Sequence, residues 1–351
     1  MSRFFSSRLS QLTPYTPGEQ PQERQYNKLN TNESPFPPSP LAQRLARQEA
    51  GTLQLYSDPE VRKLVEIGAE VFDVAEDEIL FTNSSDEALN FAFTAFCDDA
   101  HGAAFPDITY GFYPVFAQLH NIAYEEIPLK EDFTICVEDY IGIGKTIFLA
   151  NPNAPTGIAL ARSEVEKIIS GNPDNIVVVD EAYVDFGAES CRELIHKYDN
   201  LLVTQTFSKS RSMAGARLGF AFGCADLIAD LKTIKYSTNP YNVNRMTMNA
   251  GIGALADDAY FRKNCQTIIE NRAFTQKALT DLGFAMTDSM ANFLFAKHEK
   301  KGGMELYLAL KERGILIRHF ETERLKDYNR ITIGSKEQME ELIEALKEIL
   351  Q

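Results

Sequence analysis

The sequence has few cysteines and histidines, five of each in 351 residues, and neither type clusters. No two cysteines have the short spacing found in zinc sites or redox motifs, so we expect five reduced thiols. No two histidines have the spacing of a helical metal site, and we expect no structural metal. The scattered residues are Cys97, Cys136, Cys191, Cys224, Cys265, His101, His120, His196, His298 and His319.

The sequence also lacks a basic surplus and long apolar runs. Its 35 lysines and arginines face 50 acidic residues, which gives a formal net charge of -15. Such a chain has no excess positive charge for a nucleic acid or an anionic membrane, although a local basic pocket for one small anion remains compatible with it. No apolar run is long enough for a signal-peptide core or a membrane span. We therefore expect a cytoplasmic protein that binds neither nucleic acid nor membrane.

The length of the chain and its pattern of proline-rich, apolar and charged segments indicate two domains and an arm. Residues 10–40 contain too many prolines for regular structure, so we predict an N-terminal arm over 1–30 that packs with the small domain or a partner subunit. Short apolar runs then alternate with helical stretches, which favours a large α/β domain over 31–245 with a mainly parallel sheet. Charged helices and short strands predict a smaller α+β domain over 246–351.

Lys209 is the most informative single residue. It lies between two serines, shortly after the apolar run 201–203, and Arg217 follows downstream. A lysine that forms a Schiff base must lose its charge near neutral pH, which requires partial desolvation or a nearby cation. An ordinary exposed lysine is the alternative, and the residues at the ends of the other strands decide between the two.

Ligands of open parallel sheets bind beyond the carboxyl ends of the strands. The run 79–82 is followed by Ser84, Ser85 and Asp86 at the start of a predicted helix, where free backbone N–H groups suit a phosphate. A plain helix N-cap explains the same residues.

Asp180 follows the apolar run 176–179, and Tyr183 comes three residues later. A carboxylate beyond a buried strand needs a cationic or hydrogen-bonded partner, such as a protonated pyridine nitrogen. A magnesium ligand is the alternative for Asp180, and a half-buried core tyrosine is the alternative for Tyr183. Tyr110 follows another short strand and is suited to stacking on a heteroaromatic ring, although core packing explains it equally.

The combined pattern resembles the aspartate-aminotransferase class of pyridoxal-phosphate enzymes. The likeness rests on Asp-Glu-Ala-Tyr at 180–183, Ser-Lys at 208–209 with Arg217 downstream, and Asn-Pro-Asn-Ala-Pro-Thr-Gly at 151–157. Within the class the chain is similar to the histidinol-phosphate aminotransferase family, through the segments 12–21, 29–36, 56–59, 240–244 and 330–334. The resemblance implies an α/β protein of fold type I with a seven-stranded sheet, pyridoxal 5'-phosphate as cofactor, and a homodimer with shared active sites.

The resemblance also implies roles for individual residues. Lys209 would carry the cofactor, Asp180 would pair with its ring nitrogen, Tyr183 would meet its phenolic oxygen, and Tyr110 would stack on the ring. The family usually has asparagine where this chain has Ala154, and Asn153, with Asn151 as the alternative, is expected to replace its contact with the phenolic oxygen. The residues expected around the cofactor's phosphate are Ser84, Ser85, Asp86, Ser208 and Arg217, with Tyr56 contributed by a second subunit.

Arg318 and Arg330 lie beside short strands of the predicted small domain. Two arginines there would clamp an anionic substrate, either a carboxylate or a phosphate, unless they form an ordinary surface pair. Tyr15, Glu33 and Asn292 are expected to complete this pocket.

The implied activity is transamination between histidinol phosphate and 2-oxoglutarate, with glutamate as the partner amino acid, in histidine biosynthesis. Relatives on the same scaffold remain open as alternatives: an aromatic amino-acid aminotransferase or a threonine-phosphate decarboxylase. A non-catalytic pyridoxal-phosphate sensor is the alternative from another class. Lys209, Asp180 and Arg217 are all present, and no basic helix-turn-helix segment precedes residue 30, which disfavours the sensor.

Overall fold

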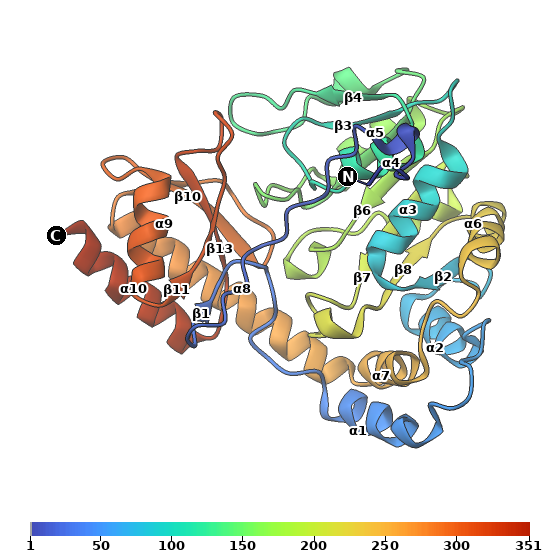
Figure 1. Cartoon of the computed structure of the whole chain (residues 1–351), viewed down its shortest axis with the longest axis horizontal. Coiled ribbons are helices and arrows are strands. Elements are labelled where there is room, and N and C mark those ends of the chain that lie inside the picture. The colour runs from blue at the N-terminus through green and yellow to red at the C-terminus, as the bar shows by residue number, and fades with distance from the viewer. Residues whose placement is uncertain (1) are drawn as a thin grey trace.

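The computed structural model describes residues 2–351, so Met1 of the predicted arm lies outside the described residues. Two parts are visible in Figure 1, a larger one built on a long twisted sheet and a smaller one that contains the C-terminus. The N-terminal segment, in dark blue, passes between them.

The larger part is organised around a seven-stranded sheet with the order β2-β8-β7-β6-β5-β3-β4. β8 runs antiparallel to both neighbours, whereas the pairs from β7 to β4 are parallel. The predicted seven-stranded, mainly parallel sheet is therefore confirmed. Its strands are β2 (Ile79–Thr82), β3 (Ala103–Pro106), β4 (Tyr124–Ile127), β5 (Thr146–Ala150), β6 (Val177–Asp180), β7 (Leu201–Thr206) and β8 (Gly219–Phe222).

Both faces of this sheet are covered by helices, which explains why its strands are continuous apolar runs. Successive residues of a strand point to opposite faces, so Val177 and Val179 belong to one core while Val178 belongs to the other. The first core includes α2 (Arg62–Phe72), α5 (Arg162–Ser170) and α7 (Arg245–Ala256), and α1 (Pro40–Glu49) packs on α7. The second includes α3 (Ser84–Phe96), α4 (Tyr113–His120) and α6 (Ala225–Thr238).

The smaller part has an antiparallel sheet with the order β12-β13-β10-β9 and its own apolar core. The helices of this part are α8 (Asp258–Asp281), α9 (Gly303–Glu312) and α10 (Lys336–Leu350). The strands are β9 (Phe284–Met286), β10 (Phe293–His298), β12 (Arg318–His319) and β13 (Tyr328–Thr332), and β1 (Asn27–Lys28) pairs in parallel with β11 (Ile315–Leu316). Short 3-10 helices occupy Ser7–Leu9, Ala50–Thr52, Val137–Tyr140, Val184–Phe186, Arg192–His196 and Ala214–Ala216.

The core of the larger part extends in sequence beyond residue 245, where the boundary between the two domains was predicted. The buried side chains of α7, including Met248 and Leu255, pack in the core beside the large sheet. The smaller core begins with α8, which contributes Cys265 and Ile268. The junction between α7 and α8 is therefore the better proposal for the domain limit.

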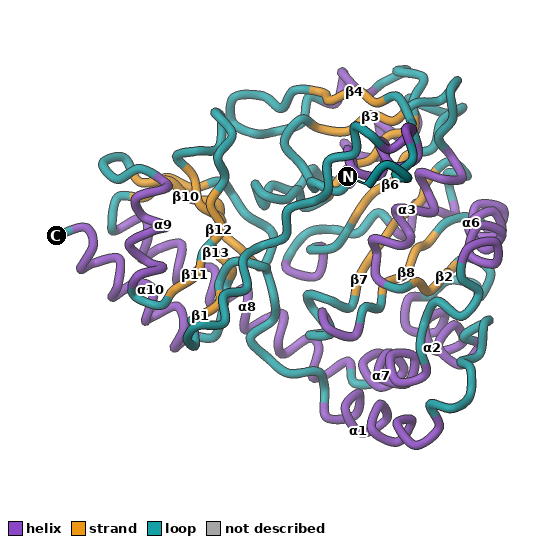
Figure 2. The backbone as a smooth tube through the Cα atoms, viewed as in Figure 1, coloured by secondary structure: helices purple, strands orange, loops and turns teal. Residues whose placement is uncertain are grey.

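The N-terminal arm joins the two parts. Figure 2 shows it mainly as loop before the short strand β1. The Thr13 amide donates a hydrogen bond to Gln118 Oε1 on α4 (3.0 Å), and the Tyr15 ring stacks on Phe112 at 4.4 Å between centroids. Further along, Arg318 of β12 donates to the carbonyl of Pro17 (3.3 Å). The arm thus lies across the opening between the large sheet and the C-terminal strands.

Candidate active site

Two adjoining cavities lie where the carboxyl ends of β5, β6 and β7 face the arm and the C-terminal strands. The inner cavity, of about 440 Å³, is lined by Ser84, Asp86, Asp180, Lys209 and Arg217 among others. The outer cavity, of about 650 Å³, extends from it toward Arg318 and Arg330. The residues that line both cavities are Thr31, Tyr110, Ala154, Tyr183 and Lys209.

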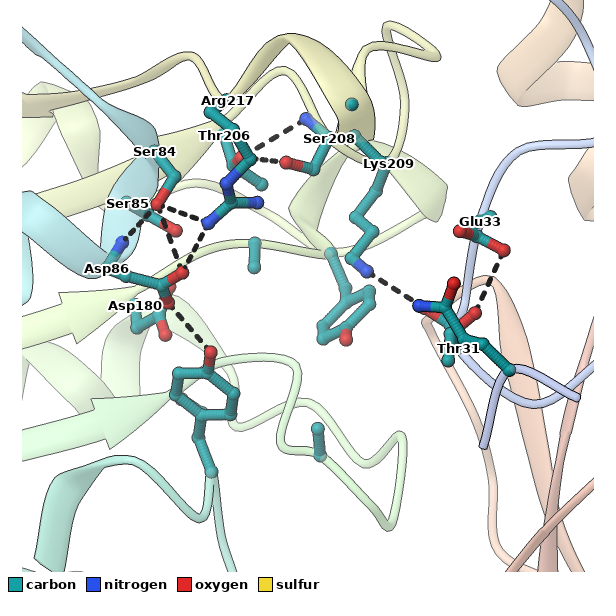
Figure 3. Close-up of a pocket in the computed structure, with 18 residues that line it drawn as sticks. Thr31, Glu33, Ser84, Ser85, Asp86, Asp180, Thr206, Ser208, Lys209 and Arg217 are labelled. Carbon is teal, nitrogen blue, oxygen red and sulfur yellow. Dashed lines mark hydrogen bonds and ion pairs between the residues drawn. The ribbon is translucent and has the colours of Figure 1, made fainter. Parts of the chain in front are cut away.

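Lys209 follows β7 and points into the junction of the two cavities, as Figure 3 shows. Its Nζ donates to the carbonyl of Thr31 at 3.2 Å and lies 5.8 Å from the centre of the Tyr183 ring. Its side chain has no ion pair with a carboxylate in the described residues, so one weak contact holds the amine. The amine is therefore available to a ligand.

Asp180, the last residue of β6, is 4% exposed at the wall of the inner cavity. Tyr113 Oη and Thr204 Oγ1 each donate to its carboxylate at 3.2 Å. Burial and the nearby charge of Asp86 raise its pKa to about 6, and these two hydrogen bonds only partly offset them. A buried carboxylate in this condition is stabilised by a cation, such as a protonated ring nitrogen. Among residues 2–351 no group of three or more acids, histidines or cysteines is placed to hold a metal ion.

The turn before α3 and the loop before β8 meet at one end of the inner cavity. Ser84 has a left-handed backbone conformation (φ 68°), and its Oγ accepts hydrogen bonds from Arg217 Nη2 (2.8 Å) and the Asp86 amide (3.1 Å). A Cβ on Gly219 would lie 2.2 Å from the Ser85 amide nitrogen, so only glycine lets β8 approach this turn. Helix N-terminal amides beside an arginine form a binding site for a phosphate.

Asp86 and Ser208 complete this end of the cavity. The Asp86 carboxylate pairs with Arg217 (2.7 Å) and accepts a hydrogen bond from Tyr110 Oη (2.7 Å), so it fixes both side chains. Ser208 lines the inner cavity and receives a hydrogen bond on Oγ from Thr206 (2.9 Å). Burial raises the pKa of Tyr110 well above its usual value, so its hydroxyl stays protonated.

The structure does not place Asn153 where it was expected to replace the missing asparagine at position 154. Asn153 Nδ2 donates to the Ile108 carbonyl (2.9 Å) and to Thr156 Oγ1 (3.2 Å), and its Oδ1 accepts from Thr109 (2.8 Å). It lines neither cavity. Asn151 is used in the same way, because its amide exchanges two hydrogen bonds with the backbone of Leu160. Both asparagines hold the turn, and Ala154 presents only a methyl group to the cavities.

Arg330 and Arg318 line the outer cavity, as expected for an anion clamp. Arg330 Nη2 donates to the Asn30 carbonyl (3.1 Å), and its guanidinium lies over the rings of Phe293 and Phe320. Its buried Nε has no partner, and burial lowers its pKa. A half-buried arginine without a carboxylate partner is prepared to bind an anionic ligand.

The other residues expected at the substrate divide into two groups. Tyr15 lines the outer cavity, and Glu33 lines the inner cavity, where it pairs with Lys28 (2.7 Å). Burial opposes the ionisation of Glu33, but hydrogen bonds from Lys28 and Thr31 keep its pKa below the usual value. Asn292, also expected at the substrate, is instead fully buried, lines neither cavity, and donates from Nδ2 to the Asn32 carbonyl (3.0 Å).

Tyr56 lies outside both cavities of its own chain. It is 79% exposed and stacks on Tyr241 at 4.6 Å between ring centroids. The backbone beside it is held by Arg245, whose Nη1 donates to the Tyr56 carbonyl (3.2 Å). A contribution to the cofactor site of a second subunit stays a prediction.

Asn32 and Arg324 are among the cavity residues that were missed from the sequence. Asn32 contacts the Tyr183 hydroxyl (3.0 Å), and Arg324 pairs with Asp107 (3.1 Å) across the outer cavity. Asn32 stands beside the predicted Glu33, and an asparagine there suits its left-handed backbone (φ 56°). Arg324 lies in a loop without a motif, and only its partner from a distant loop identifies it.

Glu181, next to Asp180, is a second buried acid with different partners. Its carboxylate accepts hydrogen bonds from Ser190 Oγ (2.6 Å), Gln205 Nε2 (2.8 Å) and the Cys191 amide (2.5 Å). Burial raises its pKa to about 7, although these three donors oppose the shift. The folded protein therefore binds a proton here that the unfolded chain releases at lower pH.

A change of Glu181 to Gln should consequently flatten the pH dependence of stability. Between about pH 4.5 and pH 7 the folded wild type holds the extra proton, so this group's contribution to the free energy of unfolding decreases as pH rises. Across that pH window, the free energy of unfolding of the wild type should fall by up to about 3 kcal/mol relative to that of Glu181→Gln. Urea denaturation of the cofactor-free proteins at several pH values measures the difference. Glu189→Gln, at an exposed acid nearby, should follow the wild type; equal slopes for wild type and Glu181→Gln would contradict the account.

The inner cavity fits pyridoxal 5'-phosphate in its donor set. It offers an amine in Lys209, a buried carboxylate in Asp180, and a phosphate cradle at Ser84 and Arg217. Tyr183 adds a hydroxyl beside the amine. The chemistry of these groups matches an aldehyde, a ring nitrogen, a phosphate and a phenolic oxygen.

Comparisons with known proteins identify the family. Residues 24–346 match the model for "Aminotransferase class I and II". Histidinol-phosphate aminotransferase of Brachyspira hyodysenteriae is 47% identical over 353 residues, and histidinol-phosphate aminotransferase 1 of Bradyrhizobium diazoefficiens is 46% identical over 350 residues, each covering 100% of both chains. A crystal structure of the Sinorhizobium meliloti histidinol-phosphate aminotransferase in complex with pyridoxal-5'-phosphate has the same fold, with a TM-score of 0.90, 24% identity, and coverage of 100% of this chain and 98% of that one.

The resemblance seen in the motifs is confirmed, because these matches extend over the whole chain and do not depend on a few short segments. The chain is an aminotransferase of classes I and II and belongs to the histidinol-phosphate aminotransferase family.

Proposed function

We propose that the chain transfers an amino group between histidinol phosphate and 2-oxoglutarate, with pyridoxal 5'-phosphate held by Lys209. The observation that carries this proposal is the convergence of an amine, a buried carboxylate and a phosphate cradle in one cavity that opens toward two arginines. The names of the most similar curated relatives support the choice of substrate.

The cofactor supplies an aldehyde that binds amines covalently and a ring that accepts electrons from the substrate carbon. Lys209 provides the amine to which the aldehyde is attached. Once a substrate amine replaces it, Lys209 Nζ is a free base beside the cavity junction and takes the proton from the substrate carbon that carries nitrogen. Its single contact to the Thr31 carbonyl leaves it free to move between these positions.

Asp180 keeps a proton on the ring nitrogen. Its carboxylate is buried and bonded to Tyr113 and Thr204, so it cannot turn toward water. The negative charge is therefore directed at the ring, where positive charge must persist while electrons enter it. Arg217, Ser84 and the amide of Ser85 anchor the phosphate.

Arg318 and Arg330 bind the anionic group of either substrate. The substrate phosphate is a tetrahedral oxyanion, and a carboxylate of 2-oxoglutarate is a planar one. An arginine can bind either of them through two hydrogen bonds. Since Arg330 is half-buried and its buried Nε has no partner, an oxyanion there gains a strong partner that is partly shielded from water.

A substrate panel tests the proposal. Purified protein with added cofactor should form glutamate from histidinol phosphate and 2-oxoglutarate with a higher kcat/KM than from phenylalanine. Threonine phosphate should give no decarboxylated product. A preference for phenylalanine, or release of carbon dioxide from threonine phosphate, would replace the proposal by the corresponding alternative, and no turnover at all would favour the sensor.

The protein is proposed to act as a homodimer in the cytoplasm. Leu53 (54% exposed), Leu55 (57%) and Tyr56 (79%) form an exposed apolar segment that a second copy would cover. None of the helices in residues 2–351 has the length and apolar character needed to cross a membrane. The five free cysteines suit a reducing compartment.

Hybrid dimers test whether Tyr56 serves the site of the other subunit. Tyr56→Ala homodimers should bind the cofactor about tenfold more weakly, because one hydrogen bond to a charged phosphate is lost. A hybrid of one Lys209→Ala subunit and one Tyr56→Ala subunit contains one site with both residues intact, if Tyr56 acts across the dimer. That hybrid should bind half the wild-type amount of cofactor with wild-type affinity; weak binding in the hybrid would place Tyr56 in its own subunit's site.

A further inference from the structure

Asn32 is clamped by residues of the C-terminal part. It is 1% exposed and has a left-handed backbone conformation (φ 56°) that asparagine tolerates better than most residues. Its amide donates to Thr332 Oγ1 (2.9 Å), and its carbonyl accepts from Asn292 Nδ2 (3.0 Å). The position of this side chain is therefore fixed from outside the cavity.

The orientation of the Asn32 side-chain amide is fixed as well. Thr332 Oγ1 donates to Asn32 Oδ1 (3.1 Å), which leaves Nδ2 on the other side of the amide group. Nδ2 donates to the Tyr183 hydroxyl oxygen at 3.0 Å. A flipped amide would bring an acceptor to Tyr183 and an NH₂ group to Thr332, which already receives a proton from the Asn32 backbone amide.

This contact determines where the proton of Tyr183 goes. Because the hydroxyl oxygen accepts from Asn32, its own proton is left to be donated to a group in the cavities that Tyr183 lines. A hydroxyl that accepts one hydrogen bond is also a stronger donor in the next, since chained hydrogen bonds polarise one another. The neighbouring wall offers no substitute donor, because position 154 is alanine and the amides of Asn151 and Asn153 are engaged in their turn.

We propose that Asn32 is a positioning residue, which directs and strengthens the hydrogen bond from Tyr183 to the phenolic oxygen of the cofactor. The proposal rests on the proposed function, since it requires pyridoxal phosphate on Lys209. A donor to the phenolic oxygen stabilises its negative charge and weakens its hold on the proton shared with the Lys209 nitrogen. Asn32 thereby lowers the pH at which the bound cofactor loses that proton.

The test is a pH titration of the visible absorption of the bound cofactor. Asn32→Ala should raise the midpoint by about half a pH unit, which corresponds to the loss of part of one hydrogen bond. Asn32→Asp keeps the size and the tolerance of the left-handed backbone but cannot donate, and it should raise the midpoint at least as far. This second variant covers the case in which the alanine variant does not fold.

A double-mutant comparison separates this role from a general structural effect. In a Tyr183→Phe background, Asn32→Ala should cause no further shift, because the hydroxyl through which it acts is gone. Asn271→Ala is the matched control, since Asn271 is likewise a buried asparagine but lines neither cavity, and it donates to the Gly334 carbonyl (3.0 Å) and not to Tyr183. It should leave the midpoint unchanged.

An unchanged midpoint in both Asn32 variants would overturn the inference, and so would an equal shift for Asn32→Ala with and without the Tyr183 hydroxyl. In either case a wild type that binds the cofactor and forms glutamate leaves the proposed function standing. A wild type that takes up no cofactor on Lys209 would remove both.

Discussion

Lys209→Ala is expected to reduce transamination by at least about 10⁴-fold, the upper range for the loss of a positioned base. The variant has neither the amine that attaches the cofactor nor the base that moves the substrate proton. The side chain points into the junction of the two cavities, held only by the Thr31 carbonyl, so its removal leaves the surrounding contacts intact. Glutamate formation from histidinol phosphate and 2-oxoglutarate measures the loss.

Lys209→Arg is the matched variant, because it keeps the positive charge but cannot lose it near neutral pH. It should be as inactive as Lys209→Ala. Cofactor binding by the phosphate cradle should survive in both variants, but the cofactor should be removable by dialysis. Turnover of either variant within about tenfold of the wild type would contradict the assignment of Lys209.

Asp180→Asn is expected to lower kcat by about 10³-fold, the range seen when one preorganised electrostatic contact to the transition state is lost. Asparagine has the same shape but no charge to keep a proton on the ring nitrogen. Since Arg217 and Ser84 are unchanged and still hold the phosphate, the cofactor should still bind. Steady-state kinetics and the absorbance of bound cofactor separate the two effects.

Thr204→Val gives a graded control for Asp180. It removes one of the two side-chain donors to the carboxylate, the 3.2 Å contact from Oγ1, without removing the charge. The expected loss in kcat is about tenfold, as for one hydrogen bond to a charged group. If Asp180→Asn and Thr204→Val had the same small effect, Asp180 would be a structural acid and not a partner of the ring nitrogen.

The sheet was predictable because it is covered on both faces. Val177, Val178 and Val179 alternate between two apolar cores, so the run is apolar throughout and is easily recognised. β4 escaped recognition because three of its four residues are exposed at the edge of the sheet. The sequence also did not show that α7 belongs to the core of the large sheet. Nothing in the sequence of α7 distinguishes a helix that packs on this sheet from one that packs elsewhere.

The residues of the candidate site that lie at or just after the carboxyl ends of strands were predictable. Asp180 and Lys209 follow buried strands, and parallel strands bring their carboxyl ends to one edge. Asn153 and Asn292 were expected to face a ligand, but neither lines a cavity, and the cause is the same for both. Both side chains are used by backbone groups distant in sequence, the Ile108 carbonyl for Asn153 and the Asn32 carbonyl for Asn292, and no local pattern reveals such partners.

Asn32 and Arg324 were missed because their partners also lie far away in the sequence. Each becomes recognisable only through a partner from another part of the chain, Tyr183 for Asn32 and Asp107 for Arg324. Side chains that follow a strand can be placed from sequence, whereas side chains that close a cavity from the arm or from a loop depend on tertiary packing.

The most direct test of the account is chemical. The protein is saturated with pyridoxal 5'-phosphate, reduced with borohydride, digested, and analysed by mass spectrometry for a pyridoxyl group. We expect one stably modified peptide per chain, with the group on Lys209 Nζ. A peptide that remains unmodified at Lys209, or a label that falls on another lysine, would contradict it.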